Sequence, residues 1–319
     1  MSAITNSYTS FSAIGNREDV TDTVYNVSPV DTPFLGSIDS TKAMAVLHEW
    51  QTDQLAPAAN NAQVEGDDST TAGYSFKAVT PTVRLGNTCQ ISRKDVVVSG
   101  TQDVVQKAGR QSEMVYQMLK RAKEIKRDME FILTNNQAAN VGSVSVARQL
   151  RPLCGWYQTN VNRGTGGANG TTTTAATDAA TTRALTENML KNGLQQCWTA
   201  GGTPDLIMTG PYNKTVISSF TGGTQKTQNI TDGTLSTAID VYASDFGFHK
   251  IIANRFSRDR DLHMISTDMW LVAYLRPIQT IDLAKTGDNL KGQILAEYTL
   301  EARNEAASGV IADLSVAAA

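Results

Sequence analysis

The segment from 101 to 135 spaces its apolar residues like a helix over an unusual length. These residues recur at alternating steps of four and three, and only Gln111 breaks the series: Val104, Ala108, Val115, Met118, Ala122, Ile125, Met129 and Ile132. A helix over the whole segment would span about 50 Å at about 1.5 Å per residue. The narrow stripe fits either a coiled coil or a helix that lies across a sheet. The strand-like sequence on both sides favours the second arrangement.

Two strand-like runs, 43–51 and 82–92, come before this segment and are separated by a polar connection. Within that connection, 56–73 has Val64 as its one bulky apolar residue. A connection of this length is either an unstructured loop or a projecting hairpin that contacts a partner. The acids in it are candidates for that contact: Glu65, Asp67 and Asp68.

The C-terminal part of the chain predicts two further structures. Residues 183–275 alternate helical and strand-like patterns, which indicates an α/β unit with a core of its own. Further on, composition favours a helix over 293–303, but the apolar residues there alternate with polar ones at period two. With 285–289 (KTGDN) as the turn, this alternation predicts a long antiparallel hairpin.

The N-terminal part predicts an arm. Residues 1–16 are rich in Ser, Thr and Asn, 16–27 has a short helical pattern, and Pro29 and Pro33 favour extended backbone before them. The few apolar residues of this part cannot form a core. We therefore expect them to pack on the body or on another copy of the chain, with Phe34 and Leu35 as candidate contacts between subunits.

Charge excludes some functions and leaves others open. The chain of 319 residues has a formal net charge of -3, which argues against a surface that binds nucleic acid or anionic membrane throughout. Its densest apolar run is too short to cross a bilayer. One basic segment, KRAKEIKR at 120–127, stands out. Helical geometry places three of its cations on one face, where they are either solvated or bind a polyanion: Lys120, Lys123 and Arg127.

No catalytic or metal-binding motif is written in the sequence, and we predict no cofactor. The three cysteines and three histidines are widely separated, without metal-ligand spacing. The glycine-rich 163–170 (RGTGGANG) matches neither a dinucleotide fingerprint nor a P-loop, and it lies in a Gly/Thr/Ala-rich stretch, 151–182, that we expect to be flexible. One charged run fits a solvated turn or an ionic rim between subunits: Arg258, Asp259, Arg260 and Asp261.

The order of these elements, with NVSPVDTPFLGSI near the start and EYTLEARNEAASGVIADL near the end, resembles one family. The chain is similar to the major capsid proteins of tailed bacteriophages with the Hong Kong 97-type fold, over roughly residues 15–314. The resemblance implies an α+β chain with five parts: an N-terminal arm (1–42), an extended loop (43–91), a peripheral domain (92–182) with a spine helix (101–135), an axial α/β domain (183–275), and a segment (276–319) that returns a hairpin to the peripheral domain and a closing strand to the axial domain.

The resemblance also implies a function without enzymatic activity. The chain would assemble with itself into hexamers and pentamers of an icosahedral shell around double-stranded DNA, which the basic face would contact without sequence preference. We expect a separate scaffolding protein, a portal, a possible decoration protein and no membrane, with synthesis in the bacterial cytoplasm and residence in the virion. Deleting residues 1–38 is expected to leave a soluble protein that forms no particles.

Two other functions stay open from the sequence. The first is an enzyme that binds a nucleotide through 163–170, and the second is a subunit of a fibre or surface layer. A nucleotide titration tests the former, and negative-stain microscopy separates closed shells from the latter.

Overall fold

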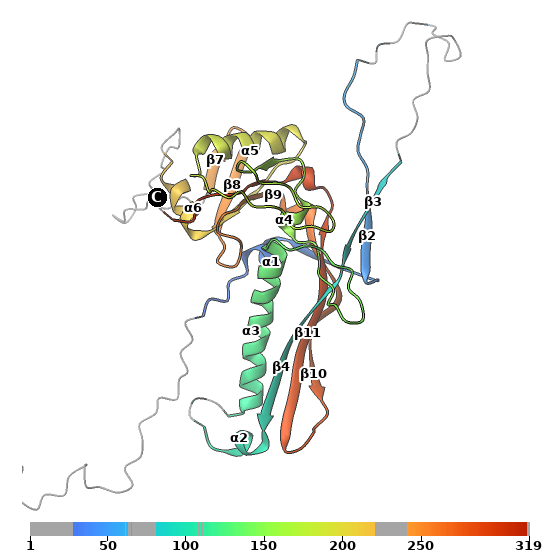
Figure 1. The fold of residues 1–319 in the computed structure, drawn as a ribbon, viewed down its shortest axis with the longest axis vertical. Coiled ribbons are helices and arrows are strands. Elements are labelled where there is room, and N and C mark those ends of the chain that lie inside the picture. The colour runs from blue at the N-terminus through green and yellow to red at the C-terminus, as the bar shows by residue number, and fades with distance from the viewer. Residues whose placement is uncertain are drawn as a thin grey trace, which may run out of the picture.

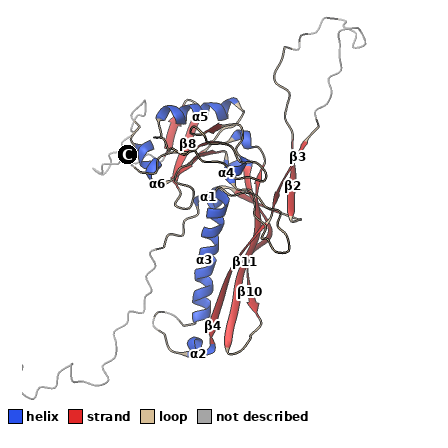
Figure 2. Cartoon of the chain, viewed as in Figure 1, coloured by secondary structure: helices blue, strands red, loops and turns tan. Residues whose placement is uncertain are grey.

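The computed structural model describes residues 28–60, 62, 65, 81–107, 109, 111–220 and 241–317. Figure 1 shows a long helix beside long strands, a smaller α/β unit at one end of them, and a two-stranded hairpin that projects from the body. Helices and strands are both well represented (Figure 2). Among the described residues, none of the helices combines the length and the apolar character needed to cross a membrane.

The long strands form a four-stranded sheet in the order β1-β10-β11-β4. Strands β10 (Trp270–Leu283) and β11 (Asn289–Ala302) pair antiparallel along most of their length. The period-two alternation therefore predicted this hairpin correctly. Strand β4 (Gln90–Ser99) pairs antiparallel with β11, and the short β1 (Asp39–Lys42) pairs parallel with β10.

The long helix is shorter than the sequence pattern predicts. Helix α2 (Gly100–Val104) ends early, and α3 (Glu113–Thr134) begins only after an irregular stretch. Ser112 caps α3 by accepting a hydrogen bond from the N–H of Val115, and Asp103 Oδ1 accepts the N–H of Glu113 at 3.0 Å. These side-chain oxygens satisfy backbone donors that a continuous helix would use itself, so the chain starts a new helix here. The predicted single helix over 101–135 is wrong in its first third.

Helix α3 lies against the four-stranded sheet and not against another helix of its own length (Figure 1). Its buried stripe is formed by Ile125, Met129 and Leu133. Gly292 of β11 lets the helix approach, because a Cβ there would lie 2.7 Å from the Cε of Met114. The packing is therefore that of a helix across a sheet, which was the favoured alternative. Val115, which the pattern places in the stripe, is 60% exposed.

The second sheet has six strands in the order β5-β12-β9-β6-β8-β7. Helices α5 (Glu187–Thr199) and α6 (Pro211–Ser218) contribute to its core through Leu190, Leu194 and Ile217. The bounds of the strands are β5 (Val161–Asn162), β6 (Leu206–Thr209), β7 (Val241–Ser244), β8 (Gly247–Ala253), β9 (Leu262–Ile265) and β12 (Gly309–Ile311).

One expected strand is divided between the two sheets. The sequence over 262–275 reads as a single strand, but β9 ends at Ile265 and a 3-10 turn, η1 (Thr267–Met269), follows it. The chain then enters β10 in the four-stranded sheet, so the expected boundary at 275 falls inside this strand. Strand β12 lies in the C-terminal segment and follows the 3-10 turn η2 (Glu305–Ala307). It pairs with β9 and β5 in the six-stranded sheet.

A buried glutamate on α3 fastens the start of the described chain to the body. Both Glu130 carboxylate oxygens accept backbone N–H groups of α1 (Pro33–Ser37), from Phe34 at 2.8 Å and from Leu35 at 2.9 Å. Asn254, which follows β8, donates its side-chain amide to the same carboxylate at 2.6 Å. Phe34 is fully buried in the core of its own subunit, and Leu35 packs against that core. The prediction that Phe34 contacts a neighbouring subunit is therefore wrong.

We expect Glu130→Gln to lower the free energy of unfolding by about 1–3 kcal/mol, because the new amide N–H group would face the N–H groups that the carboxylate now satisfies. Denaturant unfolding of the unassembled subunit measures this loss. Glu124→Gln is the matched control, since Glu124 forms only a partly exposed pair with Arg121 on the same helix and should cost within about 0.5 kcal/mol.

The same variant predicts a pH dependence. Burial raises the pKa of Glu130 above the ordinary 4.5, and the hydrogen bonds from Leu35, Phe34 and Asn254 offset only part of this rise. The folded chain therefore binds this proton more tightly than the unfolded chain, and the contribution of Glu130 to stability falls as the pH rises above 4.5. The stability advantage of wild type over Glu130→Gln should shrink in that direction, and an advantage that grows with pH would contradict the assignment.

Candidate assembly surfaces

The projecting hairpin consists of β2 (Leu47–Thr52) and β3 (Val83–Thr88), which pair antiparallel. Its base is anchored on β11: the Trp50 indole donates to the carbonyl of Ala302 at 2.8 Å, and His48 Nε2 lies 2.9 Å from Glu301 Oε2. Beyond this base the strands leave the body (Figure 1). The hairpin is therefore held firmly at one end and exposed along the rest of its described length.

A buried amide completes the anchor. Asn87 donates to the carbonyls of Arg151 and Leu300 at 3.0 and 2.8 Å, and its own oxygen accepts the N–H of Arg151 at 2.8 Å. The Arg151 guanidinium lies 4.3 Å from the ring centroid of Trp156, which in turn contacts Trp50. Because one side chain satisfies three backbone groups from two other segments, the hairpin cannot swing about its base without breaking all three bonds.

Of the three acidic candidates between β2 and β3 in the sequence, one lies within the described residues. Glu65 is exposed, which suits a contact with a partner, whereas Asp67 and Asp68 lie outside the described residues.

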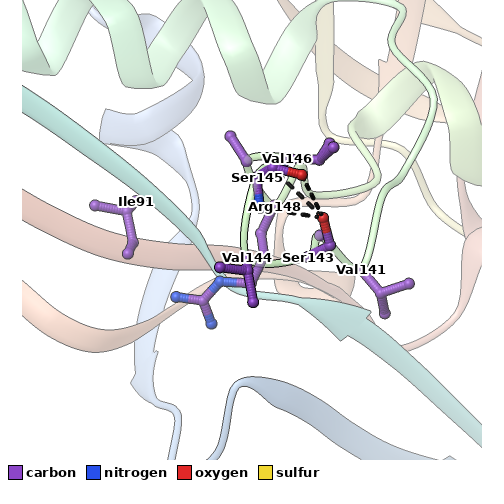
Figure 3. Close-up of a pocket in the computed structure, with 9 residues that line it drawn as sticks. Ile91, Val141, Ser143, Val144, Ser145, Val146 and Arg148 are labelled. Atoms are coloured by element: carbon purple, nitrogen blue, oxygen red, sulfur yellow. Dashed lines mark hydrogen bonds between the residues drawn. The ribbon is translucent and has the colours of Figure 1, made fainter.

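A second exposed feature is the valine loop, which we define as residues 140–149. A bridge between Asn140 and Gln149 closes it, and Ser143 stabilises its tip by accepting the N–H groups of Ser145 and Val146. Figure 3 shows these serines at the centre of the loop, while the valine side chains point away from it. Val141 is 74% exposed and Val144 110% exposed, and both help to line an open hollow that reaches Ile91 on β4.

The sequence reading did not identify the valine loop. Exposed apolar residues gathered on one short loop make it a candidate interaction surface. The sequence feature that could have identified this loop is the spacing V-x-x-V-x-V at 141–146. Closely spaced valines of this kind are also typical of an ordinary strand.

The three cations predicted on the basic face of α3 differ in how exposed they are. Lys120 and Lys123 are exposed, and within the described part of the chain neither has a carboxylate partner. Arg127 is half-buried, with its guanidinium 5.9 Å from the ring centroid of Phe256. The two lysines therefore remain available to a polyanion, and Arg127 is less so.

The charged run 258–261 lies largely inside the subunit. Arg258 pairs with Asp178, and its Nη1 lies 3.0 Å from Asp261 Oδ2. Asp261 is 1% exposed, so the prediction that it belongs to an ionic rim between subunits is wrong. Asp259 alone of the four is exposed. Burial alone would raise the pKa of Asp178, but hydrogen bonding and attraction from Arg258 and Arg260 outweigh it and lower this pKa.

The same network holds the glycine-rich segment in place. Arg260 Nη2 lies 3.0 Å from Asp313 Oδ1, and Asp313 accepts the N–H groups of Gly164 at 3.0 Å and Ala179 at 2.8 Å. These contacts tie 151–182, which we expected to be a flexible loop or linker, to the C-terminal segment. The carboxylate of Asp313 also occupies the place where a phosphate cradle would bind its anion, so the structure does not support a nucleotide site at 163–170.

The three thiols are buried. Burial raises the pKa of Cys89 to about 11 and of Cys197 to about 12, and it raises the pKa of Cys154 well above its ordinary value. None of the three has the depressed pKa that a catalytic nucleophile needs.

Comparison with known proteins agrees with this geometry. Residues 3–315 match the sequence profile of the family described as "SU10 major capsid protein". The major capsid protein of Escherichia phage Phieco32 is 28% identical over 344 residues, covering 95% of this chain and 96% of that protein.

Solved structures resemble the chain over nearly its whole length. The capsid of a native GTA particle aligns with a TM-score of 0.61 at 10% identity, covering 94% of this chain and 95% of that one. Microbacterium phage Oxtober96 aligns with a TM-score of 0.60 at 14% identity, covering 93% and 95%. At such identities the likeness shows the fold, which is of the Hong Kong 97 type. The chain thus belongs to the SU10 major capsid protein family, and it is a major capsid protein that forms the icosahedral shell of a tailed phage.

Proposed function

We propose that the subunit builds its shell through the projecting hairpin and the valine loop, and that it has no catalytic activity. The observation that carries this proposal is the exposure of both features. They are attached to the body, but they have apolar or backbone groups without partners among the described residues. When two different surfaces of identical subunits bind each other head to tail, the subunits form closed rings or curved shells if the rotation between neighbours allows closure. Electron microscopy of the purified protein tests the proposal, since closed particles support it and sheets or fibres contradict it.

We propose further partners by the same reasoning. Contacts between capsomers would also involve exposed acids, namely Glu65 and Asp259. The same role is proposed for Asp67 and Asp68, which lie outside the described residues. Related assemblies include additional proteins: one phage G structure contains decoration proteins, and a P4 procapsid contains a size determination protein. A separate scaffolding protein, a portal and a decoration protein are proposed for this chain too, with synthesis in the host cytoplasm before assembly.

The shell would enclose double-stranded DNA and contact it through α3. Lys120 and Lys123 support this step because both are exposed and project from one face of the helix, whereas Arg121 is paired with Glu124. Contacts of this type reach phosphates without reading bases, and they weaken steeply with salt.

The first prediction concerns the arm. Deleting 1–38 would remove Phe34 and leave the Glu130 carboxylate buried without its backbone donors, so that deletion tests folding as much as assembly. Deleting 1–27 keeps this anchor intact. We expect the shorter deletion to give a subunit with the wild-type unfolding midpoint that forms no closed shells in microscopy. Normal shells from this variant would show that 1–27 are not needed for assembly.

The second prediction concerns the valine loop. We expect Val141→Ser with Val144→Ser to leave the unfolding midpoint of the subunit unchanged, because both side chains are exposed. Each valine that a neighbour buries is worth about 1.5 kcal/mol, so the pair should raise the concentration needed for assembly by more than tenfold. Light scattering against subunit concentration measures this change. Val316→Ser, another exposed valine, is the control, and an unchanged assembly threshold in the double variant would exclude the loop from the interface.

The third prediction concerns DNA. We expect Lys120→Gln, Lys123→Gln and Arg127→Gln together to preserve empty shells but to lower the DNA retained by filled heads, because phosphate contacts are lost. Retention is measured across a salt series. Lys191→Gln is the charge control, because Lys191 lies on α5 and pairs with Glu187. Failure of the triple variant to assemble would identify the basic face as an interface, and unchanged retention would identify it as a solvated surface.

A further inference from the structure

Three side chains with metal-binding atoms meet in the interior. Cys154 comes from α4 (Leu153–Trp156), Asp261 from the turn before β9, and His263 from β9 itself. One ligand atom of each lies within 4.8 Å of those of the other two, and all three residues are buried. No sequence motif announces the cluster, because Cys154 is more than a hundred positions from the other two.

The histidine in this cluster has no partner in the described structure. His263 is 0% exposed, and neither its Nδ1 nor its Nε2 makes a hydrogen bond to any described residue. Among the described residues, its ring neighbour is Tyr157, stacked at 5.8 Å. A neutral imidazole has one N–H donor and one lone pair, and burying both unsatisfied costs free energy that folded proteins normally avoid. Both ring nitrogens are therefore available to a ligand.

The aspartate offers a free oxygen in the same place. Asp261 Oδ2 is taken by Arg258 at 3.0 Å and lies 3.6 Å from Cys154 Sγ, but Oδ1 has no described hydrogen-bond partner. Asp261 directly precedes β9 and His263 lies within it, and their ligand atoms lie within 4.8 Å of each other. The Cys154 thiol also lies 3.4 Å from the carbonyl of Thr134.

Backbone and charge contacts hold these residues in position. Helix α4 is fixed by Arg151, whose guanidinium donates twice to the carbonyl of Gly155 at 2.9 and 2.6 Å. The positive charges of Arg258 and Arg163 act on the cluster and would oppose a cation, and Asp178, which pairs with the other side of the Arg258 guanidinium, offsets part of this effect. The cluster therefore offers a carboxylate oxygen, a thiol and an imidazole nitrogen to one ligand.

We propose that Cys154, Asp261 and His263 bind one divalent metal ion with the ligand preferences of Zn²⁺. Sulfur, imidazole nitrogen and carboxylate oxygen are the three donor types that zinc takes in proteins, usually in tetrahedral geometry. The cysteine binds as thiolate, so its proton leaves when the ion enters. The ion would join α4, which packs in the core shared by the two sheets, to β9 of the six-stranded sheet, and so would clamp these two segments together.

The test is the metal content of the full-length chain, purified after expression in zinc-supplemented medium, both as free subunits and as shells. We expect elemental analysis to find about one zinc per chain in wild type, and we expect that zinc to be lost in Cys154→Ala and in His263→Phe. The second variant removes the imidazole nitrogens but keeps an aromatic ring beside Tyr157. Cys197→Ala is the matched control: it removes another buried thiol from the core around α5 and should keep the full zinc content.

A second measurement protects the test against misfolded variants. Wild type loaded with Co²⁺ in place of zinc should show the intense near-ultraviolet band of a thiolate–cobalt bond, and a chelator should remove this band and lower the unfolding midpoint together. Wild-type protein that holds no more zinc than His263→Phe, or that takes up Co²⁺ without a thiolate band, would overturn the proposal.

Discussion

The carboxylate of Glu130 is the contact on which the arrangement of the subunit depends. It sits on α3, accepts two N–H groups from α1, and receives the amide of Asn254 from the segment after β8. The arm, the long helix and the six-stranded sheet therefore meet at a single fully buried side chain. A buried carboxylate carries a large desolvation penalty, and the three donors compensate for it only in this one arrangement. The main effect of this contact is therefore to fix the orientation of the arm, the long helix and the six-stranded sheet. Its net contribution to stability is smaller than its effect on orientation.

The same principle recurs at the other junctions. Asn87 joins the projecting hairpin to β11 and to the segment before α4, and Asp313 joins the C-terminal segment to the glycine-rich loop. Apolar packing alone tolerates small shifts, because it is non-directional. Hydrogen bonds to buried polar groups do not, since a displaced partner leaves an unsatisfied atom. A shell subunit has to present several surfaces at fixed angles, and directional contacts at every junction supply that rigidity.

Periodicity predicted the elements whose own residues determine them. The β10–β11 hairpin followed from alternation over 294–302, and α5, β6 and α6 followed from short patterns with clear ends. The break between α2 and α3 escaped this reading because it depends on Ser112 and Asp103, whose oxygens compete with the helical hydrogen bonds. Periodicity measures which side of a helix is apolar and says little about where a cap interrupts it.

Tertiary pairings were harder to predict than elements, for a physical reason. Arg258 and Asp261 look like surface or interface residues in sequence because they lie in a run of charges, and Phe34 does so because the arm has too few apolar residues to form a core. What buries them lies far away: Glu130 for the arm, and Asp178 for the charged run. A charge is tolerated in the interior only when an opposite charge or a donor meets it, and the local sequence does not contain that partner. The valine loop is the converse case, since its apolar residues look internal by composition but are exposed in the described part of the subunit. In a protein that completes its packing through neighbouring subunits, local composition therefore fails in two ways. Charged residues that are buried mark a junction inside the subunit, and apolar residues that are exposed mark a contact with another subunit.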